Sequence, residues 1–334
     1  MQTRRAVVEN YKYAFSSSHP ARLLLLQLCI QKGTFVTTAI MVFAHLLAAA
    51  LALPAVRAAV PSIPGFSLTW SDDFVGTANS LPNPSNWIID TGTGYPGGPP
   101  QWGTWEIQSY TSSPANLKLN GNGALQITAL KNSAGQWTSA RIESQRSDFV
   151  ARPGGRMRIQ ASLNLPVVGS NGIGYWPAFW TLGRSYRGNY QNWPSVGEFD
   201  IMENVNGINR VWGVMHCGTN PGGPCRETDG LVGSRQCPNS PCQGNYHTYT
   251  LEVDRTQALE AVRWFVDGIL FWQIVSTDLP ADVWAQSVHN PHFILLNLAI
   301  GGAFPNNNYG SQTPLASTIS GGTLQAEYIA VYNS

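Results

Sequence analysis

The segment "GEFDIMEN" at residues 197–204 concentrates side chains that could do chemistry. Its three carboxylates, Glu198, Asp200 and Glu203, are separated by apolar residues at spacings of two and then three. Side chains alternate faces along a regular strand, so Glu198 and Asp200 would share one face and Glu203 would lie on the other. A β-bulge after Asp200 adds one residue and returns Glu203 to the first face. We therefore expect all three acids on one face of a central strand.

Crowded carboxylates of this kind suit the hydrolysis of a glycosidic bond. Mutual repulsion should hold a proton on at least one of them to higher pH. One carboxylate attacks the anomeric carbon, and the other protonates the leaving oxygen and later activates water. Retaining enzymes hold the pair about 5–5.5 Å apart and inverting enzymes about 6.5–9.5 Å, and two glutamates on one strand face favour the shorter separation. The alternatives are an acidic strand that faces water and a calcium site, although calcium ligands usually come from loops.

Short β-type runs that must position these acids recur along the chain between turn signals. They span residues 124–130, 140–145, 156–165, 211–216, 247–254, 292–300 and 326–332, and residues 262–275 form a predicted hairpin that turns at Asp267–Gly268. The one helix candidate of note lies near residues 280–287. This pattern predicts an all-β fold, a sandwich or jelly roll of two antiparallel sheets. The long segments rich in Gly and Pro are expected to form the rims of a cleft, at residues 91–104, 183–195 and 217–245.

The composition favours a neutral, hydroxyl-rich partner. Charged residues make up 12% of the chain and the net charge is +1, against roughly 25% charged residues in an average domain. This balance argues against binding to nucleic acid or to an anionic membrane. The 12 tryptophans suit packing against sugar faces, and we expect about half of them to fill the core instead. The sequence requires no cofactor or catalytic metal, and it leaves a structural calcium ion open without indicating one.

The first 58 residues read as a leader that contains a hydrophobic run at residues 35–53. Small residues at Val56 and Ala58 match the cleavage pattern of a secretory signal peptide, with Met41 as an alternative start. The other interpretation is an uncleaved membrane anchor, because about 20 apolar residues can span a bilayer. Both interpretations place a single catalytic domain, residues 59–334, outside the cytosol. The protein would be secreted or in the cell wall, or else anchored to the membrane through the hydrophobic run.

Four cysteines cluster within a short stretch of the predicted exported domain. They are Cys217, Cys225, Cys237 and Cys242, and in an exported chain they predict two disulfides. Three pairings are open, of which Cys217–Cys225 with Cys237–Cys242 is the simplest. A zinc site is disfavoured because the spacings lack the close cysteine pairs of zinc modules.

Several motifs, taken together, resemble glycoside hydrolase family 16 in its bulged form. They are "GYWPAFWTLG" (174–183), "NWPSVGEFDIMENVNG" (192–207), "YHTYTLEVD" (246–254), "RWFVDG" (263–268) and "LLNLAIGG" (295–302). The resemblance covers most of residues 66–332. It implies a concanavalin-like β-jelly roll with a concave cleft, and retaining hydrolysis of a β-linked polysaccharide. The subgroup that looks most similar is the fungal endo-β-1,3(4)-glucanases of the laminarinase type, so the expected partner is a β-glucan and the expected state is a monomer.

The resemblance also implies roles for individual residues. Glu198 matches the nucleophile, Glu203 the acid/base, and Asp200 the residue that tunes the nucleophile. Trp176 and Trp180 alternate in an apolar run and so share a face, where they either contact sugar or pack in the core. The positions expected to contact substrate are Trp193, His216, Trp176, Trp180, Glu106, Arg141 and Asn297, with a purely structural role as the alternative for each.

Two departures from the family pattern leave the exact substrate open. Phe199 replaces an aliphatic residue between the nucleophile and Asp200, which should alter only the packing beneath the sheet. Trp105 replaces a small or amide residue at the rim, where an indole could reshape a subsite. Hydrolysis of β-1,3-galactan, transglycosylation in the cell wall and non-catalytic glucan binding by a lectin remain as alternatives to β-1,3(4)-glucan hydrolysis.

Overall fold

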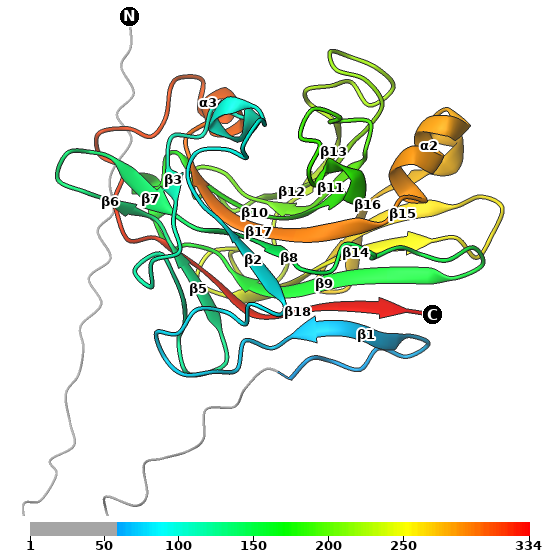
Figure 1. Ribbon diagram of the computed structural model, residues 1–334, viewed down its shortest axis with the longest axis horizontal. Coiled ribbons are helices and arrows are strands. Elements are labelled where there is room, and N and C mark those ends of the chain that lie inside the picture. The colour runs from blue at the N-terminus through cyan, green and yellow to red at the C-terminus, as the bar shows by residue number, and fades with distance from the viewer. Residues whose placement is uncertain (1–58) are drawn as a thin grey trace, which may run out of the picture. The chain divides into compact units, whose positions relative to one another are not determined.

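The computed structural model describes residues 59–334, which contain two large antiparallel sheets (Figure 1). The predicted leader and its cleavage site lie outside these residues. The all-β sandwich expected from the strand pattern is confirmed. No helix among the described residues has the length and apolar character needed to cross a membrane.

The larger sheet has the strand order β16-β15-β14-β9-β18-β5-β4, and β1 also pairs with β18. Its strands coincide with several of the predicted β-type runs, including the hairpin at Asp267–Gly268. Their bounds are β1 (Ser67–Asp72), β4 (Leu117–Leu119), β5 (Leu125–Thr128), β9 (Arg156–Asn164), β14 (Tyr246–Asp254), β15 (Ala261–Val266), β16 (Ile269–Val275) and β18 (Thr323–Asn333).

The second sheet has the order β13-β12-β11-β10-β17-β8-β2 and contains the acidic segment as its central strand, β11. Its strands are β2 (Trp87–Asp90), β8 (Arg141–Ser144), β10 (Tyr175–Gly183), β11 (Glu198–Glu203), β12 (Val211–His216), β13 (Leu231–Arg235) and β17 (His292–Ile300). A small third sheet joins β3 (Ser109–Tyr110), β6 (Leu130–Lys131) and β7 (Trp137–Ser139).

The main hydrophobic core lies between the two large sheets. Alternation along each strand sends one set of side chains inward, so Ile159 and Leu251 of one sheet and Phe179, Ile201 and Leu296 of the other are almost completely buried. Burying apolar surface contributes roughly 25 cal/mol per Å². This core therefore holds the central strands rigidly and lets their opposite faces carry polar groups.

In residues 59–334, two short α-helices lie outside the sheets. The predicted helix is present as α2 (Ala281–Val288), and a second helix, α3 (Ala303–Tyr309), was not anticipated. The segment 217–245, which was expected at the rim of a cleft, contains the strand β13. In Figure 1, α3 and the loops next to β13 rise above the seven-stranded sheet. Short 3₁₀ turns complete the fold at Pro100–Gly103, Gly169–Asn171, Arg184–Tyr186 and Ser276–Asp278.

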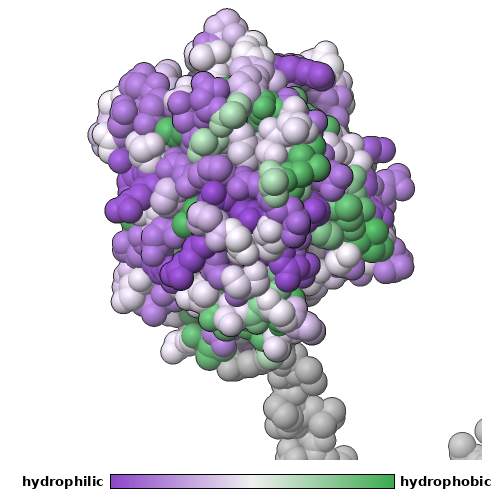
Figure 2. Space-filling view, turned by 90° about the vertical axis from the view of Figure 1, so that its right-hand side faces the viewer, coloured by the Kyte–Doolittle hydropathy of each residue, from purple (hydrophilic) through white to green (hydrophobic). Residues whose placement is uncertain are grey.

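The surface at the end of the sandwich beside α2 is mainly hydrophilic. Figure 2 shows polar residues over most of this face, with hydrophobic residues in smaller groups among them. Isolated exposed apolar residues are normal on a folded domain.

Candidate active site

The break in alternation that the sequence predicted is a β-bulge in β11. Asp200 pairs with Val214 of β12, but the next paired residue is Glu203, which faces Trp212. Two residues of β11 therefore lie opposite the single Gly213. Both Ile201 and Met202 point into the core and are at most 1% exposed. The bulge thus buries two apolar side chains and leaves all three acids on the opposite face.

That opposite face forms the floor of a cleft of about 770 Å³. Glu198, Asp200 and Glu203 line the cleft together with every residue that the sequence analysis expected to contact substrate: Trp193, His216, Trp176, Trp180, Glu106, Arg141 and Asn297. Six of the 12 tryptophans line it, so about half of the tryptophans pack elsewhere, as expected. Trp105 stands at the rim with 64% of its surface exposed.

Glu198 lies beside two hydrogen-bond donors. The Trp193 indole Nε1 donates to Glu198 Oε2 at 3.1 Å, and His216 Nε2 lies 3.8 Å from Glu198 Oε1. Burial raises the pKa of Glu198 to about 7, although His216 and Trp193 oppose this by favouring the anion. Glu198 can therefore ionise near neutral pH while it stays poorly solvated, which is suitable for a nucleophile.

Glu203 has a different environment at the other end of the bulge. The Trp176 indole Nε1 donates to Glu203 Oε1 at 2.8 Å, which leaves the second carboxyl oxygen facing the cleft without a protein donor among the described residues. Burial raises the pKa of Glu203 to about 7, and the Trp176 hydrogen bond partly offsets this effect. A carboxyl with a pKa near the working pH can give up and take back a proton, as general acid/base catalysis requires.

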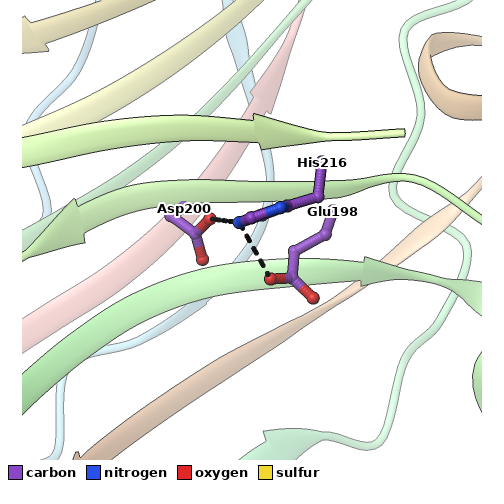
Figure 3. A group of neighbouring side chains, drawn as sticks. All are labelled: Glu198, Asp200 and His216. Carbon is purple, nitrogen blue, oxygen red and sulfur yellow. Dashed lines mark ion pairs between the residues drawn. The ribbon is translucent and has the colours of Figure 1, made fainter. Parts of the chain in front are cut away.

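Asp200 lies between the two glutamates, and Figure 3 shows it converging with Glu198 on the His216 ring. Burial, followed by the charges of Glu198 and Glu203, raises the pKa of Asp200 well above its usual value. The potential ligand atoms of Asp200, Glu198 and His216 lie within 4.8 Å of one another, as in a cation site. Burial lowers the pKa of His216, but the hydrogen bond to Glu227 and the neighbouring acids outweigh this effect and raise it.

Arg141 anchors the opposite side of the cleft through charge and aromatic contacts. Its guanidinium pairs with the buried Asp90 at 3.0 Å and donates to the Tyr95 hydroxyl at 2.9 Å. The same group lies 4.4 Å from the ring centroid of Trp102 and 4.9 Å from that of Trp180. These cation–π contacts fix the two indoles, so the position of Arg141 at the cleft is consistent with shaping a sugar-binding surface.

A hydrogen-bond chain connects Glu106 to the same surface. Buried Glu106 accepts from the Tyr110 hydroxyl at 2.8 Å, and Asn297 Nδ2 donates to that hydroxyl oxygen at 3.1 Å. Asn297 Oδ1 in turn accepts from the Trp180 indole at 2.7 Å. Glu106 and Asn297 therefore orient Trp180 within the protein, in addition to lining the cleft.

The clustered cysteines form the two disulfides of the simplest pairing, Cys217–Cys225 and Cys237–Cys242. The first closes a loop directly after β12, the strand that ends at His216. This loop leads into Glu227, whose side chain is fully buried and lies 2.7 Å from His216 Nδ1. A fourth carboxylate therefore contacts His216 from the disulfide-closed segment after β12.

Several cleft residues escaped the sequence analysis. Trp212 could have been identified, because it alternates with Val214 and His216 and so must share their face. Phe304 of α3 makes edge-on contacts with both Trp176 and Trp212, with ring centroids 5.9 and 5.2 Å apart. No local pattern signals Phe304, since its place depends on how α3 packs.

Known proteins resemble this chain in sequence and in structure. The protein family described as "XgeA-like, catalytic GH16 domain" matches this chain over residues 125–295. The chain is 31% identical over 291 residues to glucan endo-1,3-beta-glucosidase A1 of Niallia circulans, covering 81% of this chain and 38% of that protein. It is 30% identical to a beta-glucanase of Rhodothermus marinus, covering 80% and 86%.

Solved structures of glucanases are also similar to this chain. An endo-1,3-beta-glucanase from Streptomyces sioyaensis superposes with a TM-score of 0.80 at 47% identity, over 83% of this chain and 99% of that one. An endo-beta-1,3-glucanase from Pyrococcus furiosus superposes with a TM-score of 0.64 at 28% identity, over 82% and 98%. With the bulged acidic strand and the aromatic cleft already described, these similarities show that the chain belongs to glycoside hydrolase family 16.

Proposed function

We propose that the protein is a retaining endo-hydrolase of β-1,3-glucans that also accepts mixed β-1,3(4)-linked chains. The observation that carries this proposal is the pair Glu198 and Glu203 on one face of a bulged strand. Each of the two carboxyl groups accepts a hydrogen bond from a cleft tryptophan. The glucanase names of the relatives support the β-1,3 linkage. The neutral, indole-rich cleft supports an uncharged polysaccharide as substrate.

In the proposed reaction, the Glu198 carboxylate attacks the anomeric carbon while the Glu203 carboxyl protonates the departing glycosidic oxygen. The C–O bond breaks, and a covalent glycosyl ester of Glu198 forms. Glu203, now a carboxylate, removes a proton from water, which attacks the same carbon and releases Glu198. Asp200 lies beside the nucleophile and modulates its charge, and no cofactor is required.

The disulfides suggest that the domain works outside the reducing cytosol. We propose secretion or attachment at the cell surface, with the leader providing either route. A monomer suffices for the proposed reaction, because one chain supplies all three acids and the lined cleft.

The test is an assay of purified protein on laminarin, mixed-linkage β-glucan, β-1,3-galactan and xyloglucan, with products sized over time. We expect laminarin to be cut fastest, with a ladder of oligosaccharides early in the reaction. Added oligosaccharide acceptors should leave the products unchanged, whereas longer products would favour transglycosylation. Faster cutting of galactan or xyloglucan would overturn the proposed substrate.

A matched pair of variants tests the nucleophile. Glu198→Gln keeps the side chain's shape but cannot form a stable ester, so turnover should be abolished while laminarin binding persists. Glu327→Gln, a glutamate on β18 of the other sheet, should keep wild-type turnover. Near-normal activity of Glu198→Gln would overturn the assignment, and complete loss of binding as well as turnover would point to misfolding.

A further inference from the structure

Glu227 is a buried carboxylate outside the catalytic strand, and both of its oxygens have partners. Oε1 accepts a hydrogen bond from the backbone N–H of Cys217 at 2.8 Å, and Oε2 lies 2.7 Å from Nδ1 of His216. Its side chain has no exposed surface. An ionised carboxylate only accepts hydrogen bonds. The imidazole must therefore carry its hydrogen on Nδ1.

The other ring nitrogen of His216 faces the catalytic acids. Nε2 lies 3.5 Å from Asp200 Oδ2 and 3.8 Å from Glu198 Oε1. Asp200 Oδ2 is buried and has no hydrogen-bond partner within the described domain, so the imidazole is the polar group beside it. When Asp200 and Glu198 are ionised, a lone pair on Nε2 would repel their oxygens, whereas an N–H attracts them. The surroundings thus favour hydrogen on both nitrogens.

We propose that Glu227 is a positioning residue for catalysis: it holds His216 as a double donor, with Nε2–H directed at Asp200 and Glu198. This inference rests on the proposed hydrolytic function of the site. Through Glu227, the loop after β12 would then influence the ionisation of Glu198, the proposed nucleophile. Glu227 itself lies behind the imidazole and touches neither the cleft nor the substrate.

The groups that surround the imidazole agree with this assignment. Glu198, Asp200 and Glu203 face it from β11, Glu227 faces it from the loop, and the Trp193 ring lies 5.4 Å away by ring centroids. Burial alone would lower the pKa of His216, but the nearby acids outweigh this effect and raise it. These neighbours, all within residues 59–334, include no Lys or Arg, so a protonated imidazole is the cation of the cluster.

The loop that carries Glu227 is fixed at two points. The Cys217–Cys225 disulfide closes it, and Gly222 and Glu227 form an antiparallel bridge within it. Cys217 also supplies the backbone N–H that holds Oε1. Glu227 is therefore pre-oriented before any substrate binds, which keeps the His216 ring from rotating.

Glu227→Gln tests the proposal because the amide has one favourable orientation. Its oxygen must accept from the Cys217 N–H, so its NH₂ group must donate to Nδ1 of His216. That donation requires a lone pair on Nδ1 and leaves a neutral imidazole with hydrogen on Nε2 only. The ring keeps its position and its Nε2–H but loses its charge.

The first readout is kcat/KM on laminarin as a function of pH. His216 lowers the pKa of Glu198 more than Glu227 raises it, so losing both charges should move the acid limb to higher pH. At pH values below that limb, we expect kcat/KM of Glu227→Gln to be roughly tenfold lower than that of wild type, the effect of one pKa unit. Its KM should stay within about twofold of the wild-type KM. An unmoved acid limb would overturn the proposal, even if total activity fell.

The matched control is Asp267→Asn, which alters a second His–carboxylate pair. Asp267 lies in the turn between β15 and β16 of the other sheet. Its Oδ2 is 2.7 Å from Nδ1 of the buried His247 on β14. This variant removes the same charge from the same kind of pair. It should leave the acid limb in place, and an equal shift in both variants would count against a specific role for Glu227.

The second readout requires neither the Glu227→Gln variant nor a measurement of activity. Nitrogen-15 NMR of wild-type protein, with the ring signals assigned through His216→Gln, reports which nitrogens carry hydrogen. We expect both to be protonated at about pH 7.5, roughly one unit above the usual histidine pKa, and a neutral ring at that pH would overturn the proposal. A wild type that is inactive on laminarin but has a doubly protonated His216 would refute the proposed function and leave the positioning intact.

Discussion

At the scale of single residues, the three acids of β11 differ in their partners rather than in their chemistry. Trp193 and His216 favour the anion of Glu198, whereas Glu203 has one indole donor and one oxygen open to the cleft. Burial raises the pKa of both glutamates to about 7. The neighbours, more than the carboxyl groups themselves, therefore separate the proposed nucleophile from the proposed acid/base.

These raised pKa values make a prediction about stability. The unfolded chain releases a proton from Glu203 near pH 4.5, whereas the folded protein holds it to about pH 7. The free energy of unfolding therefore falls as pH rises from 4.5 to 7, and this loss of stability is complete above pH 7. Glu203→Gln removes the penalty, so we expect it to stabilise the protein at pH 8 by on the order of 2 kcal/mol.

Thermal unfolding at pH 4 and pH 8 checks this prediction. The gain should appear at pH 8 and be absent or reversed at pH 4, where both proteins carry an uncharged side chain. Glu327→Gln serves as the control, and its stability relative to wild type should not show this pH dependence. A Glu203→Gln protein that is less stable than wild type at pH 8 would contradict the cost assigned to burial.

At the scale of elements, the bulge in β11 reconciles two demands on one strand. Ile201 and Met202 both fill the core, while Asp200 and Glu203 both face the cleft. A regular strand cannot place two consecutive residues on the same side. The extra residue therefore fills the core as well as keeping the proposed catalytic acids on one face.

Deleting Met202 should damage both roles. The remaining Glu-x-Asp-x-Glu spacing alternates regularly, but it removes a buried side chain, at a cost of about 2–5 kcal/mol, and shifts the pairing with β10 and β12. Displacing an acid by about 1 Å can cost roughly a hundredfold in rate. Melting temperature and laminarin turnover measure the two effects. Met202→Leu keeps the strand length and should retain activity, and a deletion variant equal to wild type in both measurements would show that the bulge is incidental.

The two disulfides should be separable by their effect on catalysis. Each closes a short loop, so removing either pair as Cys→Ala should cost about 2–3 kcal/mol of unfolding free energy. Only the Cys217–Cys225 loop holds Glu227 against His216. We expect its loss to move the acid limb of kcat/KM, while loss of Cys237–Cys242 leaves the limb unchanged. Urea unfolding and pH profiles of the two double variants test this, and identical profiles would contradict it.

At the scale of the whole molecule, the sandwich separates stability from chemistry. The inner faces of both sheets form the core, and the outer face of the seven-stranded sheet is free to carry buried acids that destabilise the fold. α3 and the loop after β12 add cleft residues at the rims without interrupting this core. The scaffold therefore tolerates a costly site because its core lies elsewhere.

The overall charge predicts how binding responds to salt. With a net charge of +1 and a neutral substrate, long-range attraction contributes little to association, and salt screens only exposed charges. We expect KM for laminarin to change by less than about twofold between 50 and 500 mM NaCl. Initial-rate kinetics across this range test the expectation, and a steep loss of affinity would indicate a charged substrate instead.

The sequence by itself determined the features that have a local period. Alternation predicted most strands, the spacing of Glu198, Asp200 and Glu203 predicted the bulge, and the clustered cysteines predicted two disulfides, because each pattern depends on residues a few positions apart. The same local rules placed Trp176 and Trp180 on one face. They failed at α3, a short helix that has no strong signal.

Only the tertiary structure decided which distant residues meet. Glu227 reaches His216 because a disulfide folds its loop back over β12, and Phe304 reaches Trp176 because α3 packs against the sheet. Arg141 finds Asp90 only because β8 pairs with β2. Such contacts depend on strand order and loop closure, which the local spacing of residues in the sequence does not encode. The residues that contact the cleft residues from behind therefore became visible only in the folded protein.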